Sequence, residues 1–103
     1  MRRAAKRDDN EGAIIDALRD VGCRVTQLSG AGVPDLLVGR RGVTYLLEVK
    51  DPTKPKRDQR LTEPQVQWHG EWAGVGGPCV IVRTIEEALR AVGCVWSSSG
   101  VRP

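Results

Sequence analysis

The sequence contains no Phe and only one Met, one Tyr and one His, so aromatic bulk is scarce. A hydrophobic core must therefore come from Val, Leu, Ile, Ala and three Trp residues. No apolar run approaches the roughly 20 residues that a membrane-spanning helix needs, and Met1 is followed by charge rather than by an apolar signal region. The composition, 40% hydrophobic and 28% charged, is typical of a soluble globular protein, so we expect a cytoplasmic protein without a membrane partner.

Cysteine is also scarce, with Cys23, Cys79 and Cys94 widely spaced and without a CxxC pair. This odd number and spacing argue against a disulfide framework and against a thiolate zinc site. We expect three reduced, mostly buried thiols.

Basic residues are present in moderate excess, with a formal net charge of +3 and a pI near 9.0. Two interpretations of this excess stay open: solvated loops, or a surface that binds nucleic acid. The basic side chains gather in three groups: Arg2, Arg3, Lys6 and Arg7; Arg40 and Arg41; and Lys50, Lys54, Lys56, Arg57 and Arg60.

The length of 103 residues fits one domain. Residues 1–9 are charged and without apolar periodicity, which predicts a basic flexible arm; residues 10–96 form the domain, and 97–103 a flexible tail. The first expected elements are a helix over 11–21, with Asn10 as its N-cap, and a strand over 23–28. Two further strands, 35–39 and 43–50, flank a tight turn at Arg41-Gly42.

The second half of the domain begins with a polar loop over 51–61. Thr62 and Gln65 then fit a capping box for a helix that ends near Gly74. The apolar run 79–83 predicts a central strand covered on both faces, and Thr84 opens a last helix that stops at Gly93. The order α-β-β-β-α-β-α predicts an α/β sandwich around a mixed sheet of about four strands.

Chemistry is suggested by the strand over 43–50, where alternation places Glu48 and Lys50 on one face, about 7 Å apart. A two-residue turn at Arg41-Gly42 sets Asp35 opposite Glu48, whereas a three-residue turn would shift the register by one position. The carboxylates of Asp35 and Glu48 could hold Mg²⁺ or Mn²⁺ for phosphodiester hydrolysis. Lys50 could then orient or deprotonate the attacking water, or neutralise charge on the phosphate. The alternative is an ordinary surface ion pair of Glu48 with Lys50.

Glu11 is an unexpected carboxylate on the apolar face of the first helix, in line with Ile14, Ile15 and Leu18. It could be a solvated first-turn residue favoured by the helix dipole. It could instead be a further carboxylate that approaches the metal.

Two segments resemble the PD-(D/E)xK nuclease superfamily: Gly32-Val33-Pro34-Asp35 and Glu48-Val49-Lys50. GVPDLLVG, YLLEVK, LTEPQVQWHGEW and TIEEAL together resemble the VRR-NUC family, the virus-type replication and repair nucleases, over roughly residues 11–93. The resemblance implies a restriction-endonuclease-like fold. It also implies that Asp35, Glu48 and the Val49 carbonyl bind the metal, that Lys50 serves the water, and that an acidic residue on the first helix, here Glu11, joins them.

Gln65 matches the family's glutamine at the start of the helix that follows the EVK strand. Its place in the capping box explains it equally well, and both roles could hold together. On the same helix, we expect His69 to be a solvated residue, and Trp68 and Trp72 to be core residues rather than base-stacking platforms.

Together these features predict a stand-alone, phage-type endonuclease, located in the host cytoplasm if phage-encoded, that cuts branched DNA such as four-way (Holliday) junctions or flaps. The family resemblance implies a homodimer, and we expect no small-molecule cofactor. The alternatives are a restriction-type nuclease or exonuclease of the same superfamily, and a non-catalytic DNA-binding module. The expected DNA contacts are Arg40, Arg41, Lys54, Lys56, Arg57 and Arg60.

Overall fold

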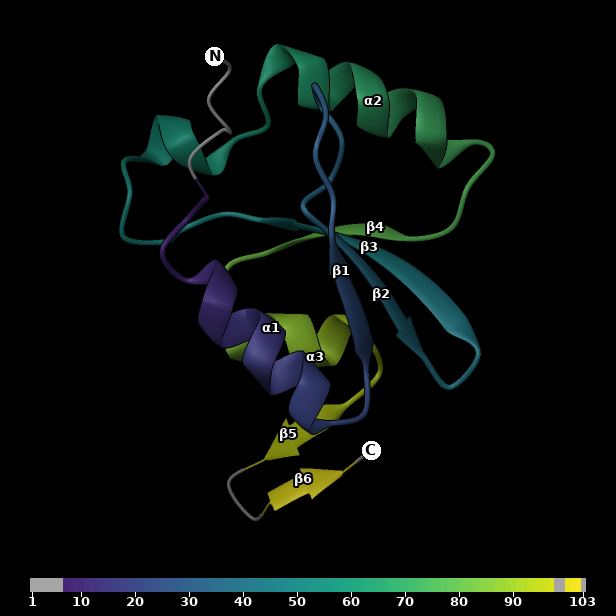
Figure 1. Ribbon diagram of the computed structural model, residues 1–103. Coiled ribbons are helices and arrows are strands. Elements are labelled where there is room, and N and C mark those ends of the chain that lie inside the picture. Colours follow the sequence, from purple (N-terminus) through teal and green to yellow (C-terminus); the bar gives the residue numbers. More distant parts are fainter. Residues whose placement is uncertain (1–6, 98–99, 103) are drawn as a thin grey trace, which may run out of the picture.

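The secondary structure follows the predicted order, in a computed structural model that describes residues 7–97 and 100–102 (Figure 1). The helices are α1 (Glu11–Asp20), α2 (Glu63–Ala73), α3 (Ile85–Ala91) and a short 3-10 helix, η1 (Lys56–Gln59). The strands are β1 (Arg24–Gln27), β2 (Leu36–Arg40), β3 (Val43–Val49), β4 (Cys79–Val82), β5 (Val95–Ser97) and β6 (Gly100–Arg102).

The main sheet is mixed and has the strand order β1-β2-β3-β4. β1, β2 and β3 pair antiparallel, and β4 pairs parallel with β3. Arg40 pairs with Val43 across a two-residue turn in which Arg41 and Gly42 have φ values of 51° and 83°. Two positive φ values in succession are the geometry that joins twisted strands most closely. The predicted register is therefore confirmed, with Leu36 opposite Leu47 and Asp35 in line with Glu48.

The prediction that residues 79–83 form a central strand is wrong, because β4 is at the edge of the main sheet. Val80 and Val82 pack on the core, and Cys79 approaches α2 on the other face. An apolar run indicates that both faces of a strand are covered. It does not indicate whether the strand pairs with a neighbour on one edge or on both.

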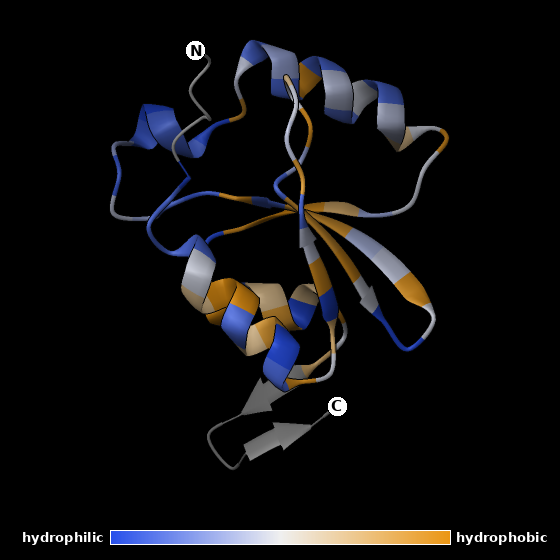
Figure 2. Ribbon diagram, viewed as in Figure 1, coloured by the Kyte–Doolittle hydropathy of each residue, from blue (hydrophilic) through white to orange (hydrophobic). Residues whose placement is uncertain are grey.

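Helices cover the two faces of the sheet unequally: α1 and α3 lie together on one face and α2 on the other (Figure 1). The core lies beneath α1 and α3, where the ribbon is most hydrophobic (Figure 2). It includes Ile14 and Leu18 of α1 and Leu47 and Val49 of β3. No residue of α2 is fully buried. The predicted alternation of β3 is thus confirmed, since Glu48 and Lys50 face α2.

The predicted N-cap hydrogen bonds form at the start of α2 but not at the start of α1. Thr62 and Gln65 form the capping box of α2, as predicted. Asn10 precedes α1 but makes no cap hydrogen bond. Its Nδ2 instead donates to the Lys50 carbonyl (3.1 Å) and the Arg83 carbonyl (2.8 Å), so it ties the start of α1 to the segments that leave β3 and β4.

Trp68 and Trp72 lie outside the core, contrary to expectation. They stack on each other with ring centroids 5.1 Å apart, and Trp72 Nε1 donates to the Gly77 carbonyl. Each ring therefore covers part of the apolar surface of the other, on a helix that is only partly buried.

The predicted flexible ends need correction where the structure describes them. Arg7, assigned to the basic arm, makes ordered contacts with the first helix and the β1–β2 loop. Gly100–Arg102, assigned to the tail, pairs with Val95–Ser97 through backbone hydrogen bonds that need no apolar periodicity. Residues 1–6, 98, 99 and 103 are outside the described residues.

The described part of the chain contains no helix long and apolar enough to cross a bilayer. All three cysteines are free, with Cys23 and Cys94 buried and Cys79 half-buried, as expected.

Candidate active site

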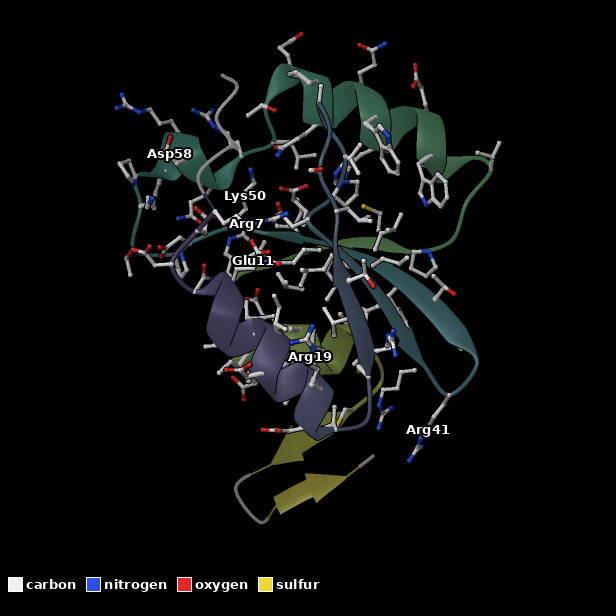
Figure 3. The ribbon with its side chains drawn as sticks, in the orientation of Figure 1. Arg7, Glu11, Arg19, Arg41, Lys50 and Asp58 are labelled. Atoms are coloured by element: carbon white, nitrogen blue, oxygen red, sulfur yellow. The ribbon has the colours of Figure 1, made fainter. Side chains whose placement is uncertain are left out.

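The predicted catalytic residues meet in one cleft of about 770 Å³ where β3 ends, between the β1–β2 loop and the start of α2. Arg7, Glu11 and Lys50 lie close together there (Figure 3). The cleft is lined by Asp35, Glu48, Val49, Lys50 and Gln65, with Arg7, Asp8 and the loop over 28–33.

Asp35 is held against the Glu48-Val49-Lys50 segment by a backbone hydrogen bond. The Val49 N–H donates to Asp35 Oδ2 at 2.8 Å. In an extended strand the N–H and C=O of one residue point to the same edge. The Val49 carbonyl therefore lies on the Asp35 side of β3, as a metal-binding role would require.

Glu48 is almost completely buried, with 2% of its surface exposed. Its Oε2 accepts a hydrogen bond from Gln65 Nε2 (3.0 Å) and lies 3.9 Å from Lys50 Nζ. Its Oε1 is buried and has no hydrogen-bond partner in the described structure. Burial, and secondly the nearby Asp35 carboxylate, raise the pKa of Glu48 to about 8. A cation placed between Asp35 and Glu48 would remove the reason for Glu48 to keep its proton.

Gln65 performs both of the roles that the sequence left open. Its Oε1 accepts hydrogen bonds from the Thr62 N–H (2.9 Å) and from Lys50 Nζ (3.0 Å). Since its Nε2 also donates to Glu48, the side chain caps α2 and holds the carboxylate and the ammonium in a fixed relation. Lys50 is buried with its charged end directed at this group.

Glu11 is buried, so the interpretation as a solvated first-turn residue is wrong. Its Oε2 accepts hydrogen bonds from Arg7 Nη1 (2.9 Å) and Gln27 Nε2 (3.1 Å). Burial raises the pKa of Glu11. Because Arg7 also reaches Asp35, Glu11 belongs to the edge of the same carboxylate group.

His69 is not the solvated residue that the sequence predicted. Its Nε2 is 3.6 Å from Glu48 Oε1, and its Nδ1 is 3.5 Å from Cys79 Sγ. Burial, with a smaller effect of Lys50, lowers the pKa of His69. The signal was available in the sequence, because His69 follows Gln65 by four positions and so shares its helix face.

Solved structures provide the comparison that supports the family resemblance. The chain is similar to a structure described as "VRR_NUC domain", with 27% sequence identity and a TM-score of 0.57 over 82% of this chain and 96% of that one. No protein-family model and no curated protein matches the chain. The structural match agrees with the Pro34-Asp35 and Glu48-Val49-Lys50 segments that the cleft brings together. The chain is therefore similar to the VRR-NUC family, in agreement with the resemblance of its sequence motifs. It is a nuclease-type domain with a restriction-endonuclease-like fold.

The oxygen atoms of this cleft fit a hard divalent ion of the kind that the fold usually uses. Within residues 7–97 and 100–102, no three His, Cys, Asp or Glu side chains already form a metal cage. Mg²⁺ usually keeps several waters and takes only one or two protein carboxylates, so Asp35 and Glu48 are sufficient. The buried, unpartnered Oε1 of Glu48 is a free ligand atom for such an ion.

The basic residues proposed for DNA contact divide into two groups. Arg40 is buried and donates from Nε to the Val21 carbonyl and from Nη1 to the Val92 carbonyl, which argues against the predicted DNA contact. Arg41 lies at the far end of the β2–β3 hairpin, remote from Lys50 (Figure 3).

The second group lies in the segment that follows β3, and Asp58 of η1, in the same segment, lines the cleft. Gln59 fixes this segment, since its Nε2 donates to the Asp51 and Lys54 carbonyls and its Oε1 accepts from Arg83 Nε. The side chains of this group are half-buried at Lys54 and exposed at Lys56, Arg57 and Arg60.

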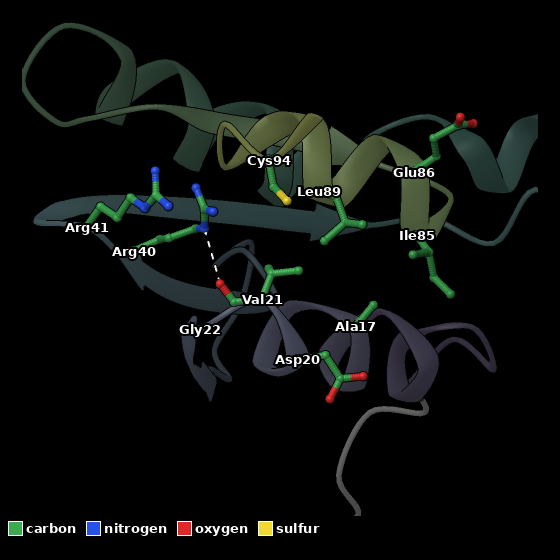
Figure 4. Close-up of a pocket in the computed structure, with 10 residues that line it drawn as sticks. All are labelled: Ala17, Asp20, Val21, Gly22, Arg40, Arg41, Ile85, Glu86, Leu89 and Cys94. Carbon is green, nitrogen blue, oxygen red and sulfur yellow. Dashed lines mark hydrogen bonds between the residues drawn. The ribbon is translucent and has the colours of Figure 1, made fainter. Parts of the chain in front are cut away.

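A second, larger groove of about 1070 Å³ lies between α1, α3 and the β2–β3 turn (Figure 4). Its lining is mainly aliphatic, with Ala17, Val21 and Leu89, and its charged residues do not include a paired carboxylate and lysine. Of these two pockets, only the smaller, polar cleft therefore contains the paired carboxylates and the lysine.

Proposed function

We propose that this domain is a metal-dependent endonuclease that hydrolyses phosphodiester bonds in DNA, selecting branched structures such as four-way junctions or flaps. One observation carries the proposal: Asp35, Glu48 and Lys50 line one cleft, and Gln65 bridges the last two. This juxtaposition of two carboxylates and an ammonium is what metal-assisted hydrolysis requires.

Each residue has a role that follows from its surroundings. Asp35, Glu48 and the Val49 carbonyl would hold Mg²⁺ or Mn²⁺, with Glu11 as a further carboxylate nearby. When bound, the divalent ion supplies Lewis-acid polarisation of the scissile phosphate and of a water molecule. Lys50, held by Gln65 at 3.0 Å, either orients the attacking water or neutralises charge that develops on the phosphate. Gln65, which belongs to α2, holds the Lys50 ammonium and the Glu48 carboxylate at a fixed distance from each other.

The choice of branched DNA rests on the small size of the domain and on the basic segment beside the cleft. Lys54, Lys56, Arg57 and Arg60 contact phosphates in this proposal, and phosphate contacts carry no direct sequence information. Recognition is therefore of DNA shape. A branched two-fold substrate is matched by a homodimer that presents two clefts, and we propose this assembly as well.

Cleavage assays with purified protein test the proposal on three substrates of matched sequence: a four-way junction, a flap and a linear duplex. We expect cleavage of branched DNA with Mg²⁺ or Mn²⁺ and none with EDTA. Equal cleavage of linear duplex would favour a restriction-type enzyme, and release of mononucleotides an exonuclease. If every branched DNA stays uncut at low salt with Mn²⁺, the domain is a DNA-binding module and the proposal fails.

A further inference from the structure

Arg7 occupies the position between Glu11 and Asp35 with its guanidinium group. Its Nη1 donates to Glu11 Oε2 at 2.9 Å and lies 3.5 Å from Asp35 Oδ1. Its Nη2 donates to the Leu28 carbonyl at 2.6 Å. The acceptors come from α1 and from the two ends of the β1–β2 loop, so one side chain joins these two segments at the cleft. Figure 3 shows Arg7 beside Glu11.

The Arg7 guanidinium is a positive charge surrounded by the oxygen atoms of Glu11, Asp35 and Leu28. Arg cannot lose its proton in a protein, so the charge is permanent. Glu11 is buried and Asp35 is partly exposed, and both would be poorly compensated without a positive partner. Any second cation that approaches Asp35 and Glu11 meets Arg7 first.

The position of Arg7 also allows it to leave. Its side chain is 33% exposed, and it precedes α1 rather than belonging to the packed core. Release would expose the guanidinium to solvent at little steric cost. Since Asp35 also accepts from the Val49 N–H, that carboxylate stays in place when Arg7 departs.

We infer that Arg7 is an exchangeable internal cation that competes with the divalent metal ion for Asp35 and Glu11. It stabilises the carboxylates before the metal binds, and the metal displaces it. The inference rests on the proposed function, because it requires that these carboxylates bind a metal.

The test measures Mn²⁺ binding by isothermal titration calorimetry at pH 8 and low salt, without DNA. The proteins are wild type, Arg7→Gln and Arg19→Gln. Arg19 is a matched control on α1, because the substitution removes the same charge from a residue that donates to the Val25 carbonyl and contacts no carboxylate. We expect Arg7→Gln to bind Mn²⁺ about tenfold more tightly, as loss of a charge-assisted competitor predicts, and Arg19→Gln to match wild type.

Equal or weaker binding by Arg7→Gln overturns the inference, as does an equal gain in Arg19→Gln. If the wild type and Arg7→Gln both fail to bind Mn²⁺, the metal dependence in the proposed function fails with it. Equal Mn²⁺ binding by the two overturns the role of Arg7 alone.

Nitrogen NMR of the wild type provides a readout that does not depend on the folding of a variant. During a Mg²⁺ titration, the Arg7 Nε resonance is expected to shift with the midpoint of metal binding, and that of Arg19 to stay unchanged. An Arg7 signal that is unaltered at saturating Mg²⁺ overturns displacement.

Discussion

At the scale of single residues, Gln65 links stability and chemistry. It closes the capping box of α2 and bridges Glu48 and Lys50 with the same amide group. The spacing to Thr62 predicted the cap, and the resemblance to the VRR-NUC family implied the active-site role. Only the structure places Lys50 Nζ and the Thr62 N–H on the same oxygen.

Substitutions at Gln65 and Thr62 separate these two roles. Thr62→Ala removes the cap hydrogen bond to the Gln65 N–H but keeps the amide bridge. Both Thr62→Ala and Gln65→Ala should lower the free energy of unfolding by about 1 kcal/mol, a usual cost of losing a cap. Only Gln65→Ala should also slow single-turnover DNA cleavage, by about tenfold or more. Equal losses of cleavage in the two variants would contradict the bridge.

The buried Glu48 makes the metal-free protein sensitive to pH. Its pKa is about 8 in the folded state, mainly because of burial, against an ordinary 4.5. A folded state that binds the extra proton is stabilised fully below pH 4.5 and loses this contribution as pH rises through about 8.

In EDTA, the Tm of the wild type should therefore fall between pH 5 and pH 9. Glu48→Gln, which carries no titrating proton, should show a flatter Tm profile and a Tm higher by on the order of 5 °C at pH 9. Parallel profiles of the two proteins by calorimetry would refute the assignment of the raised pKa to Glu48.

At the scale of elements, the β2–β3 hairpin was predictable and the surroundings of the site were not. The Arg41-Gly42 turn fixes the register locally, so the alignment of Asp35 with Glu48 followed from the sequence. The edge position of β4 depends on chain crossover, which periodicity does not encode. Arg7 and His69 were misjudged because their partners are distant in sequence or on another element.

Gly32 lies where the β1–β2 loop contacts the start of α2. It has a φ of +78°, and a Cβ built there would lie 2.2 Å from the Pro64 carbonyl oxygen at the start of α2. Any side chain would push the β1–β2 loop away from α2, and with it Asp35 from Gln65.

Gly32→Ala should therefore lower both Tm and cleavage. Gly12→Ala is the control, because Gly12 lies in the first turn of α1 with nothing within 4 Å of its Cβ position, and replacing Gly with Ala in a helix stabilises it by up to about 1 kcal/mol. We expect Gly12→Ala to raise Tm and to leave cleavage unchanged. A Gly32→Ala protein with wild-type Tm would show that the loop contact is unimportant.

At the scale of the whole molecule, the groove of Figure 4 includes the turn of the β2–β3 hairpin, whereas the candidate active-site cleft lies at the other end of the hairpin. The basic segment over 54–60 borders the cleft, whereas Arg41 lies at the remote turn (Figure 3). The sequence proposed cations of both groups as DNA contacts, because it shows where charge gathers along the chain but not which charges face the cleft.

DNA binding without cleavage distinguishes the two groups. In EDTA, Arg57→Ala should weaken binding to a four-way junction and reduce the slope of log K against log salt by about 1, as loss of one phosphate contact predicts. Arg41→Ala should leave both quantities unchanged. The opposite result, with Arg41 sensitive and Arg57 silent, would place DNA on the far side of the molecule.

The central claim is that Lys50 acts in hydrolysis while Asp35 and Glu48 hold the metal. The most direct measurement pairs Mn²⁺ binding with single-turnover cleavage of a four-way junction by Lys50→Ala. We predict that Mn²⁺ binding is retained and that the cleavage rate falls by about 100-fold or more. Cleavage by Lys50→Ala at the wild-type rate would contradict the account.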